Sequence, residues 1–327
     1  MNANSSASDR RLPWFAMRGL MLLTAHLPDQ SQQVAAQGLA DILAHLPLAR
    51  RRIALDNLAL AFPRLDAAER RQILRTSLRY WVQTAIELAA CAGRIISAEE
   101  LARRVDIQGL AYLDQARAEG HGVIALTAHF GNFPWIVLAL APRGYPAAAV
   151  YKEASDFVPN FFGSIMQRYG VIPIRVVGKE RSALTRPILR ALREGRIVLM
   201  NMDQSAANGL PVQFFGHPAW TPMGPVILAR RSGAPIVPMF MHHQGMGHRL
   251  EIQPPYLLSQ QTDKEAALRE DVQRLSEVIE QAVRAEPQEW YWVHRRWKRP
   301  ARASDASYAN GDRESKEHSS QDIGKPS

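Results

Sequence analysis

Short apolar runs alternate with helix-like stretches through the middle of this chain. The run at residues 122–128 follows a glycine and is apolar with β-branched members, which is typical of a buried strand. Comparable runs lie at residues 147–151, 171–174, 197–200, 235–240 and 249–252. Because helical segments separate these runs, the pattern predicts an α/β fold with a mixed, mostly parallel sheet flanked by helices.

Helical spacing dominates the N-terminal third of the chain and returns near the end of the apolar part. Asp66 followed by Glu69 is a capping-box signal, and Ser97 followed by Glu100 is a second one. Residues 264–285 carry apolar side chains at helical spacing, which predicts a closing amphipathic helix. The domain therefore has a helical N-terminal part.

The two ends of the chain differ from its body. Residues 12–27 mix aromatic and aliphatic side chains with nearby arginines, but fall short of the roughly 20 apolar residues of a spanning helix. A helix lying in the membrane interface, a helix packed on the domain's own core, and a tilted span all remain open. Residues 301–327 are polar and charged, which predicts a disordered tail. We divide the chain into a membrane-interface segment (1–30), a main domain (31–300) and a tail (301–327).

Charge and cysteine content restrict the partners and the compartment. The 327 residues carry a formal net charge of +9. A basic body suits anionic partners such as phospholipid head groups, phosphorylated glycolipids, an acidic carrier protein or nucleic acid. The single cysteine, Cys91, cannot form an internal disulfide, so a reducing compartment is favoured and Cys91 is expected to be a small buried side chain.

The sharpest chemical signal is His129. It follows the strand predicted at 122–128 and precedes a Gly131–Asn132 turn, with Pro134 where a helix could begin. The carboxyl edge of a sheet is where α/β proteins hold their ligands, and an imidazole there could serve as a general base. Main-chain N–H groups of the turn and the helix start could bind an oxyanion. A histidine hydrogen-bonded inside the core is the alternative.

Two other groups of residues invite different readings. His242, His243 and His248 suggest zinc, but residues 244–247 look like a hairpin turn and no cysteine or nearby carboxylate completes a site, so we expect no metal. Residues 294–298 interleave aromatic and cationic side chains, as nucleic-acid contacts do. No nucleic-acid-binding fold accompanies them, so we expect this segment to anchor the chain beside the sheet or at the membrane, with no nucleic-acid partner.

Several separated blocks resemble, in order, those of the lipid A late acyltransferases, the lauroyl- and myristoyltransferase group of the lysophospholipid acyltransferase superfamily. The blocks lie at residues 49–58, 61–63, 129–132, 203–204, 214–216, 222–225, 229–238 and 290–298. The resemblance extends over about residues 12–300. It implies a glycerolipid-acyltransferase-like fold.

The resemblance also implies a catalytic pair. In that family a histidine and an acidic residue stand at His-x4-Asp or His-x4-Glu spacing; the histidine deprotonates the acceptor hydroxyl and the carboxylate orients the ring. His129 matches the first position, but Pro134 occupies the second. Three alternatives follow: another carboxylate, Glu153 or Asp203, replaces the acid; a backbone carbonyl or water orients the ring; or the chemistry is lost.

The matching blocks imply further site residues. Those expected to bind substrate are Gly131, Asn132, Gln204, Phe215, Gly216 and Arg230. Each has a plainer structural alternative: a turn or helix cap for Asp203–Gln204, core packing for Phe215, and a solvated helix face for Arg230.

The implied reaction moves a fatty acyl chain from acyl carrier protein or acyl-CoA to a hydroxyl of a membrane lipid or glycolipid, such as a lipid A precursor. The implied location is the cytoplasmic side of the inner membrane, held peripherally or by one N-terminal anchor, and no cofactor is expected. Two alternatives stay open. The acceptor could be a lysophospholipid, an aminolipid or a polyene lipid, or the chain could be a non-catalytic lipid- or carrier-binding protein.

Overall fold

The computed structural model describes residues 19, 23, 26–46, 49–93, 95–152, 161–176 and 184–298. Nearly all of the predicted interface helix at 12–27, and all of the tail at 301–327, lie outside the described residues.

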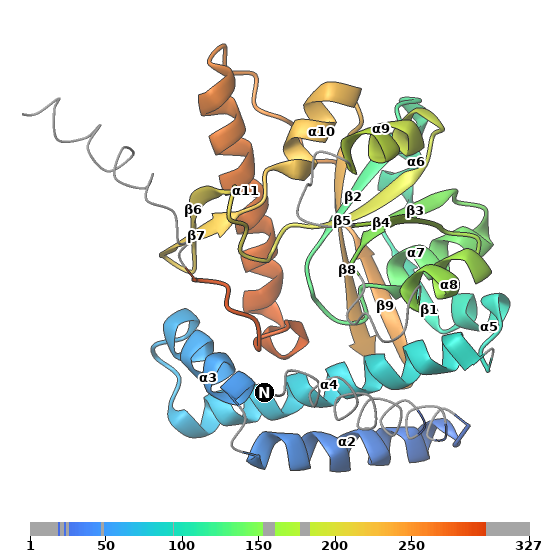
Figure 1. The fold of residues 1–327 in the computed structure, drawn as a ribbon, viewed down its shortest axis with the longest axis vertical. Coiled ribbons are helices and arrows are strands. Elements are labelled where there is room, and N and C mark those ends of the chain that lie inside the picture. Colours follow the sequence, from blue (N-terminus) through green and yellow to red (C-terminus); the bar gives the residue numbers. More distant parts are fainter. Residues whose placement is uncertain are drawn as a thin grey trace, which may run out of the picture.

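A seven-stranded sheet forms the centre of the molecule (Figure 1). Neighbouring strands β8, β2, β5, β3 and β4 are parallel, β9 is antiparallel to β8, and β1 is parallel to β9. The prediction of a mixed, mostly parallel sheet is confirmed. In spatial order the strands are β1 (Val105–Gln108), β9 (Gly247–Ile252), β8 (Ile236–Gln244), β2 (Val123–Thr127), β5 (Ile197–Asn201), β3 (Ala147–Tyr151) and β4 (Ile172–Arg175).

Helices cover both faces of this sheet and supply the N-terminal part. α4 runs across one end of the sheet with α2 alongside it (Figure 1). The predicted capping box is present: the Asp66 N–H donates to Glu69 Oε2, and the Glu69 N–H donates to Asp66 Oδ1. The helices are α2 (Asp29–His45), α3 (Ala49–Ala61), α4 (Ala67–Gly93), α5 (Ala98–Arg103), α6 (Leu110–Ala118), α7 (Trp135–Leu140), α8 (Phe161–Arg168), α9 (Thr185–Arg193), α10 (Gly224–Ser232) and α11 (Lys264–Ala285).

Alternate side chains of the central strands fill two separate cores. Val123 and Ala125 of β2 face a core built with residues of α4 to α8. Ile124 and Leu126 face the opposite core, which includes residues of α3, α9, α10 and α11. β2 is thus buried on both sides, which explains why its sequence is an unbroken apolar run.

A small hairpin, β6 (Leu210–Phe214) and β7 (His217–Thr221), lies apart from the main sheet. Its two-residue turn is Phe215–Gly216, and both residues have positive φ, 54° and 73°. This geometry is that of a type I′ turn, which suits the twist of a hairpin. Neither these strands nor β1 is predicted from the sequence, because β1 is short with alternating polar positions and β6 contains a proline.

The outer face of α2 is apolar and exposed. Val34 is 73% and Ile42 59% exposed, and Leu27 just before the helix is 42% exposed. Among the described residues, no helix combines the length and apolar character that crossing a bilayer requires.

Candidate active site

Two adjacent parallel strands bring His129 and Asp203 together. Thr127 at the end of β2 is in register with Asn201 at the end of β5, and the Met202 N–H donates to the Thr127 carbonyl at 3.2 Å. The chain therefore leaves both strands at the same edge of the sheet. His129 lies two residues beyond one strand and Asp203 two residues beyond the other, and their side chains meet.

The Asp203 carboxylate is buried and orients the imidazole. Its Oδ1 lies 2.8 Å from His129 Nδ1, and its Oδ2 accepts the His129 main-chain N–H at 2.9 Å. An ionised carboxylate only accepts hydrogen bonds, so Nδ1 carries the proton and Nε2 keeps its lone pair. The arrangement is that of a histidine base held by an acid.

The surroundings keep Asp203 ionised. Burial by itself would raise the pKa of this carboxyl, but the charge of His129 and the hydrogen bonds from His129 outweigh burial and hold that pKa well below its usual range. The Trp290 indole N–H also donates to Asp203 Oδ2, at 2.9 Å. Asp203 thus remains an acceptor for the ring across the neutral pH range.

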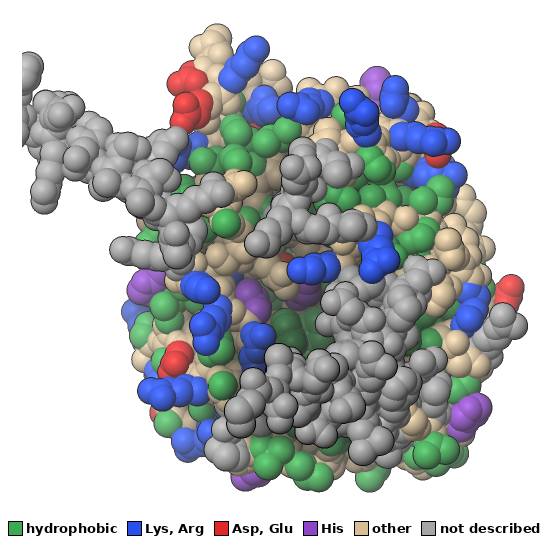
Figure 2. Space-filling view, in the orientation of Figure 1, with side chains coloured by type: hydrophobic (Ala, Val, Ile, Leu, Met, Phe, Trp, Pro, Cys, Tyr) green, Lys and Arg blue, Asp and Glu red, His purple; other side chains and the backbone are tan. Residues whose placement is uncertain are grey.

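The other face of the imidazole opens outward. The His129 side chain is 21% exposed, and its Nε2 lies 3.1 Å from the amide nitrogen of the exposed Gln204. The rings of Phe133 and Tyr291 flank it, with centroids at 5.0 and 6.4 Å. Figure 2 shows a hollow in this face of the molecule that holds hydrophobic and histidine side chains and is bordered by lysines and arginines. Among the described residues, Gln204 is the hydrogen-bond partner of His129 Nε2.

The turn after His129 is built into the core. Gly131 has φ +52°, and a Cβ on it would lie 1.7 Å from the Met241 carbonyl oxygen, so no other residue fits there without moving β8. Asn132 is fully buried and donates from Nδ2 to Glu87 Oε2 at 2.6 Å. Gly131 and Asn132, expected from the sequence to bind substrate, therefore pack against β8 and α4 inside the protein.

The expectation that N–H groups of this turn bind an oxyanion is wrong for Gly131, and the N–H of His129 just before the turn is also occupied. The His129 N–H donates to Asp203, and the Gly131 N–H donates to the Glu289 carbonyl at 2.9 Å. Neither is free to bind a substrate oxygen. Pro134 is the N-cap of α7, so the helix begins there as the sequence predicts.

The remaining predicted residues lie in different places. Glu153 lies outside the described residues. Phe215 is 5% exposed and packs against Phe62 and Trp292, and so belongs to an aromatic core at the hairpin turn that it forms with Gly216. The position of Phe215 matches the core-packing alternative, whereas Gly216 is exposed.

Arg230 lies away from His129. It makes an ion pair with the buried Asp271 and donates to the Ser259 carbonyl at 3.0 Å. Gly233, which ends the helix α10 that carries Arg230, faces the ring of His121. His121 lies just before β2, whereas His129 lies just after it, so the two histidines mark opposite ends of this strand. Arg230 is therefore toward the opposite end of the sheet and has a structural partner there.

The start of the 290–298 segment lies beside the site, whereas residues 294–298, expected to anchor the chain beside the sheet or at the membrane, contact the β6–β7 hairpin. Trp290 pairs with Phe130 in a β-bridge, and the Tyr291 N–H donates to the His129 carbonyl at 3.0 Å. Arg296 is 1% exposed and donates to the Trp220 carbonyl and the Thr221 hydroxyl. The hydrogen bond from the Trp290 indole to Asp203 is not predicted from the sequence, because 87 residues separate the two.

Known proteins similar to this chain are named as acyltransferases. A family model described as bacterial lipid A biosynthesis acyltransferase matches residues 4–299. The chain is 27% identical over 206 residues to a phosphatidylinositol mannoside acyltransferase of Mycobacterium tuberculosis, with 62% of this chain and 63% of that protein covered. It is 27% identical over 206 residues to a lipid A biosynthesis acyltransferase of Haemophilus influenzae (61% of each), and 24% identical over 207 residues to the lipid A biosynthesis lauroyltransferase of Escherichia coli (61% and 63%).

The matched segments thus span under two thirds of the length of these curated relatives. The family model, in contrast, takes in nearly the whole chain, from the N-terminal helices to the segment around Trp290. The chain belongs to the bacterial lipid A biosynthesis acyltransferase family.

Proposed function

We propose that this protein is an acyltransferase that moves a fatty acyl chain from an acyl thioester to a hydroxyl of a membrane lipid or glycolipid. The single observation that carries the proposal is the 2.8 Å contact between His129 Nδ1 and Asp203 Oδ1, with Nε2 directed outward. It completes a base–carboxylate pair although Pro134 stands where the family has an acid. No observation on the described residues favours a non-catalytic role.

In this mechanism His129 Nε2 takes the proton of the acceptor hydroxyl as the oxygen attacks the thioester carbonyl. The new C–O bond gives a tetrahedral intermediate, and the imidazolium is stabilised by Asp203. When the C–S bond breaks, the proton passes from Nε2 to the leaving thiolate, which restores the neutral ring. Gln204, whose amide now contacts Nε2, would give way to the hydroxyl and donate to a substrate oxygen.

The names of the relatives guide the choice of acceptor. Both lipid A and phosphatidylinositol mannosides are glycolipids, and acyltransferases for both are among the relatives. We therefore propose a glycolipid acceptor such as a lipid A precursor, ahead of a lysophospholipid, an aminolipid or a polyene lipid. The donor is acyl carrier protein or acyl-CoA, and the net charge of +9 favours the anionic groups of either.

The membrane is the place where such substrates meet the enzyme. The exposed apolar side chains of α2, with Val34 and Ile42 the most exposed among them, would lie in the interfacial layer of the cytoplasmic leaflet of the inner membrane. This supports peripheral association through α2 and the N-terminal segment. Bound in this way, the protein would meet its acceptor without removing it from the bilayer.

The test is the lipid composition of a strain that lacks the protein. Mass spectrometry of total lipids should show one lipid class missing an acyl chain, and the mass difference gives the chain length. A plasmid carrying the wild-type gene should restore that chain, whereas His129→Ala should not. His217→Ala, a change in an exposed histidine of the hairpin, is the matched control and should restore it fully. Restoration by His129→Ala would overturn the enzymatic assignment.

A further inference from the structure

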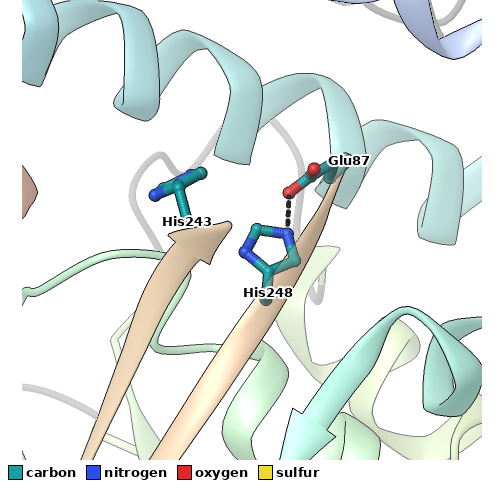
Figure 3. A group of neighbouring side chains, drawn as sticks. All are labelled: Glu87, His243 and His248. Carbon is teal, nitrogen blue, oxygen red and sulfur yellow. Dashed lines mark hydrogen bonds and ion pairs between the residues drawn. The ribbon is translucent and has the colours of Figure 1, made fainter. Parts of the chain in front are cut away.

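Three side chains from different parts of the sequence meet behind the turn that follows His129. Glu87 comes from the middle of α4, His243 from the end of β8, and His248 from the start of β9 (Figure 3). One ligand atom of each, a carboxylate oxygen or a ring nitrogen, lies within 4.8 Å of the other two. The β8–β9 hairpin is the one the sequence predicts, but the expectation that no carboxylate lies near its histidines is wrong, because α4 supplies one.

The three side chains are buried almost completely. Their exposed fractions are 7% for Glu87, 4% for His243 and 1% for His248. Glu87 Oε2 lies 3.0 Å from His248 Nε2. Two ligands bound at about 2.0–2.1 Å in a tetrahedral zinc site lie roughly 3.3 Å apart, so this spacing needs little adjustment to hold an ion.

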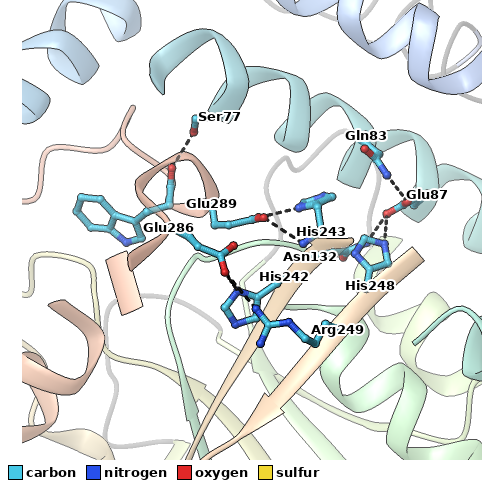
Figure 4. Close-up of polar contacts among 11 residues, drawn as sticks. Ser77, Gln83, Glu87, Asn132, His242, His243, His248, Arg249, Glu286 and Glu289 are labelled. Carbon is cyan, nitrogen blue, oxygen red and sulfur yellow. Dashed lines mark hydrogen bonds and ion pairs between the residues drawn. The ribbon is translucent and has the colours of Figure 1, made fainter. Parts of the chain in front are cut away.

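A second layer of residues orients these groups (Figure 4). Glu289 Oε2 contacts His243 Nδ1 at 2.7 Å, which places the proton on Nδ1 and leaves Nε2 as a lone-pair donor. Gln83 and Asn132 donate to the two carboxylate oxygens of Glu87, at 3.0 and 2.6 Å. Metal-binding histidines in proteins commonly hydrogen-bond to a carboxylate through their second ring nitrogen, and metal-binding carboxylates commonly accept hydrogen bonds from neighbouring side chains.

Several polar atoms of this cluster have no partner. Among the described residues, none makes a hydrogen bond to His243 Nε2, His248 Nδ1 or Asn132 Oδ1, and all three atoms are buried. Leaving a buried acceptor or donor unpaired costs about 1–3 kcal/mol, so the unpaired atoms of His243 and Asn132 point to a ligand beyond the protein's own hydrogen bonds. His243 Nε2 is a nitrogen lone pair, which a cation would satisfy.

The charge balance also favours a cation. Glu87 and the 1%-exposed Glu289 are two buried carboxylates, and each contacts one of the two histidines: Glu289 contacts His243 and Glu87 contacts His248. A divalent cation held by the two neutral imidazoles would balance the charge of these two carboxylates.

We propose that Glu87, His243 and His248 bind one divalent transition-metal ion, with zinc the best match to two imidazoles and a carboxylate. A water or Asn132 Oδ1 would complete a tetrahedral site. The ion would be structural: Asn132 belongs to the turn after His129, and Glu289 precedes Trp290, the donor to Asp203. It would fix the turn after the base and the segment whose Trp290 donates to the acid, without touching substrate.

The test measures metal binding by the full-length protein after removal of any histidine tag. Protein stripped with a chelator and dialysed against excess Zn²⁺ should retain one zinc ion per chain by plasma mass spectrometry, and Co²⁺ in its place should give the intense visible bands of a four-coordinate site. Zn²⁺ should also raise Tm. Wild-type protein that retains only substoichiometric metal and shows no Tm rise would overturn the proposal.

Variants locate the site and separate it from the proposed function. His243→Gln and His248→Gln should each lose at least tenfold in Zn²⁺ affinity. His242→Gln is the matched control, since His242 faces Glu251 and Glu286 instead, and should bind like wild type. His129→Ala should also bind zinc normally, so loss of acyl transfer and loss of metal are distinguishable. If both glutamine variants bind zinc as wild type does, the site is wrong; if they fail to fold, the wild-type Co²⁺ spectrum and Tm decide.

Discussion

The carboxylate of Asp203 contacts His129 at two points, the ring Nδ1 at 2.8 Å and the main-chain N–H at 2.9 Å. The two residues are 74 positions apart and come from the ends of adjacent parallel strands. The double contact fixes both the position of the residue and the orientation of its ring. In the proposed mechanism Asp203, which follows β5, takes the role that the family resemblance gives to an acid five residues after the histidine, and Pro134 is the N-cap of α7.

Asp203→Asn should lower kcat by about 10²- to 10⁴-fold with little change in KM. The amide keeps the shape but carries no charge to stabilise the imidazolium, and its NH₂ can favour the wrong tautomer of the ring. Steady-state acyl transfer with purified protein measures this. Asp106→Asn, at an exposed position of β1, is the control and should be unaffected. Full activity of Asp203→Asn would show that another group orients His129.

Pro134→Glu should not raise kcat/KM. The family's acid would return to its usual sequence position, but His129 Nδ1 already makes its hydrogen bond to Asp203, so a second carboxylate has no proton to accept. The measurement is acyl transfer under kcat/KM conditions beside Pro134→Gln, which has similar bulk without charge. A gain of tenfold or more in the glutamate variant alone would mean that the Asp203 pairing is incomplete.

Protein stability should fall as the pH drops from about 6.5 toward 4, in part because of His294. Burial lowers the pKa of His294 to about 4, and the nearby Asp203 offsets only part of this effect. The folded state therefore binds the proton less readily than the unfolded state does, and stability present above pH 6.5 is lost as the pH falls toward the folded pKa. The loss should be roughly 2–3 kcal/mol.

Urea unfolding between pH 7.5 and 4.5 measures this effect. His294→Asn should give a flatter dependence of the unfolding free energy on pH than wild type. The exposed His217→Asn serves as control and should keep the wild-type slope. Equal slopes in all three proteins would contradict the assignment to His294.

Asn57→Ala should destabilise the fold by about 2–3 kcal/mol. The buried amide of Asn57 donates to the carbonyls of Trp292 and His294, at 2.7 and 2.8 Å, and so attaches α3 to the segment that supports Asp203. Alanine would leave both carbonyls without this donor. Urea unfolding compares it with Asp56→Ala, whose side chain is exposed. A change under about 0.5 kcal/mol would show that water replaces the amide without cost.

The main features of the fold are predictable from the sequence because burial has a clear signature there. Strand β2 is buried on both faces and therefore reads as an unbroken apolar run, and α11 has the spacing of a helix with one buried face. β1 and the β6–β7 hairpin are short and partly polar, so no periodic pattern identifies them. The resemblance to the family points to the block around Phe215 but not to its position in a hairpin turn.

The site is predictable only as far as neighbouring strands determine it. His129 and Asp203 follow two runs that read as strands, so their meeting at one edge of the sheet is a reasonable expectation. The hydrogen bond that Trp290 donates to Asp203, and the contact between Glu87 of α4 and His248 of β9, depend on long-range packing that leaves no local pattern. Arg230 shows the reverse case, because a charged side chain that looks available in the sequence has a buried partner, Asp271.

The most direct test of the central claim is acyl transfer in vitro by His129→Ala. Purified wild-type protein, supplied with labelled acyl carrier protein or acyl-CoA and with the deacylated lipid from a deletion strain, should label that lipid. His129→Ala, folded to the same extent by circular dichroism and Tm, should be slower by about 10³-fold or more. Labelling by His129→Ala at a rate within tenfold of wild type would contradict the assignment of His129 as the base.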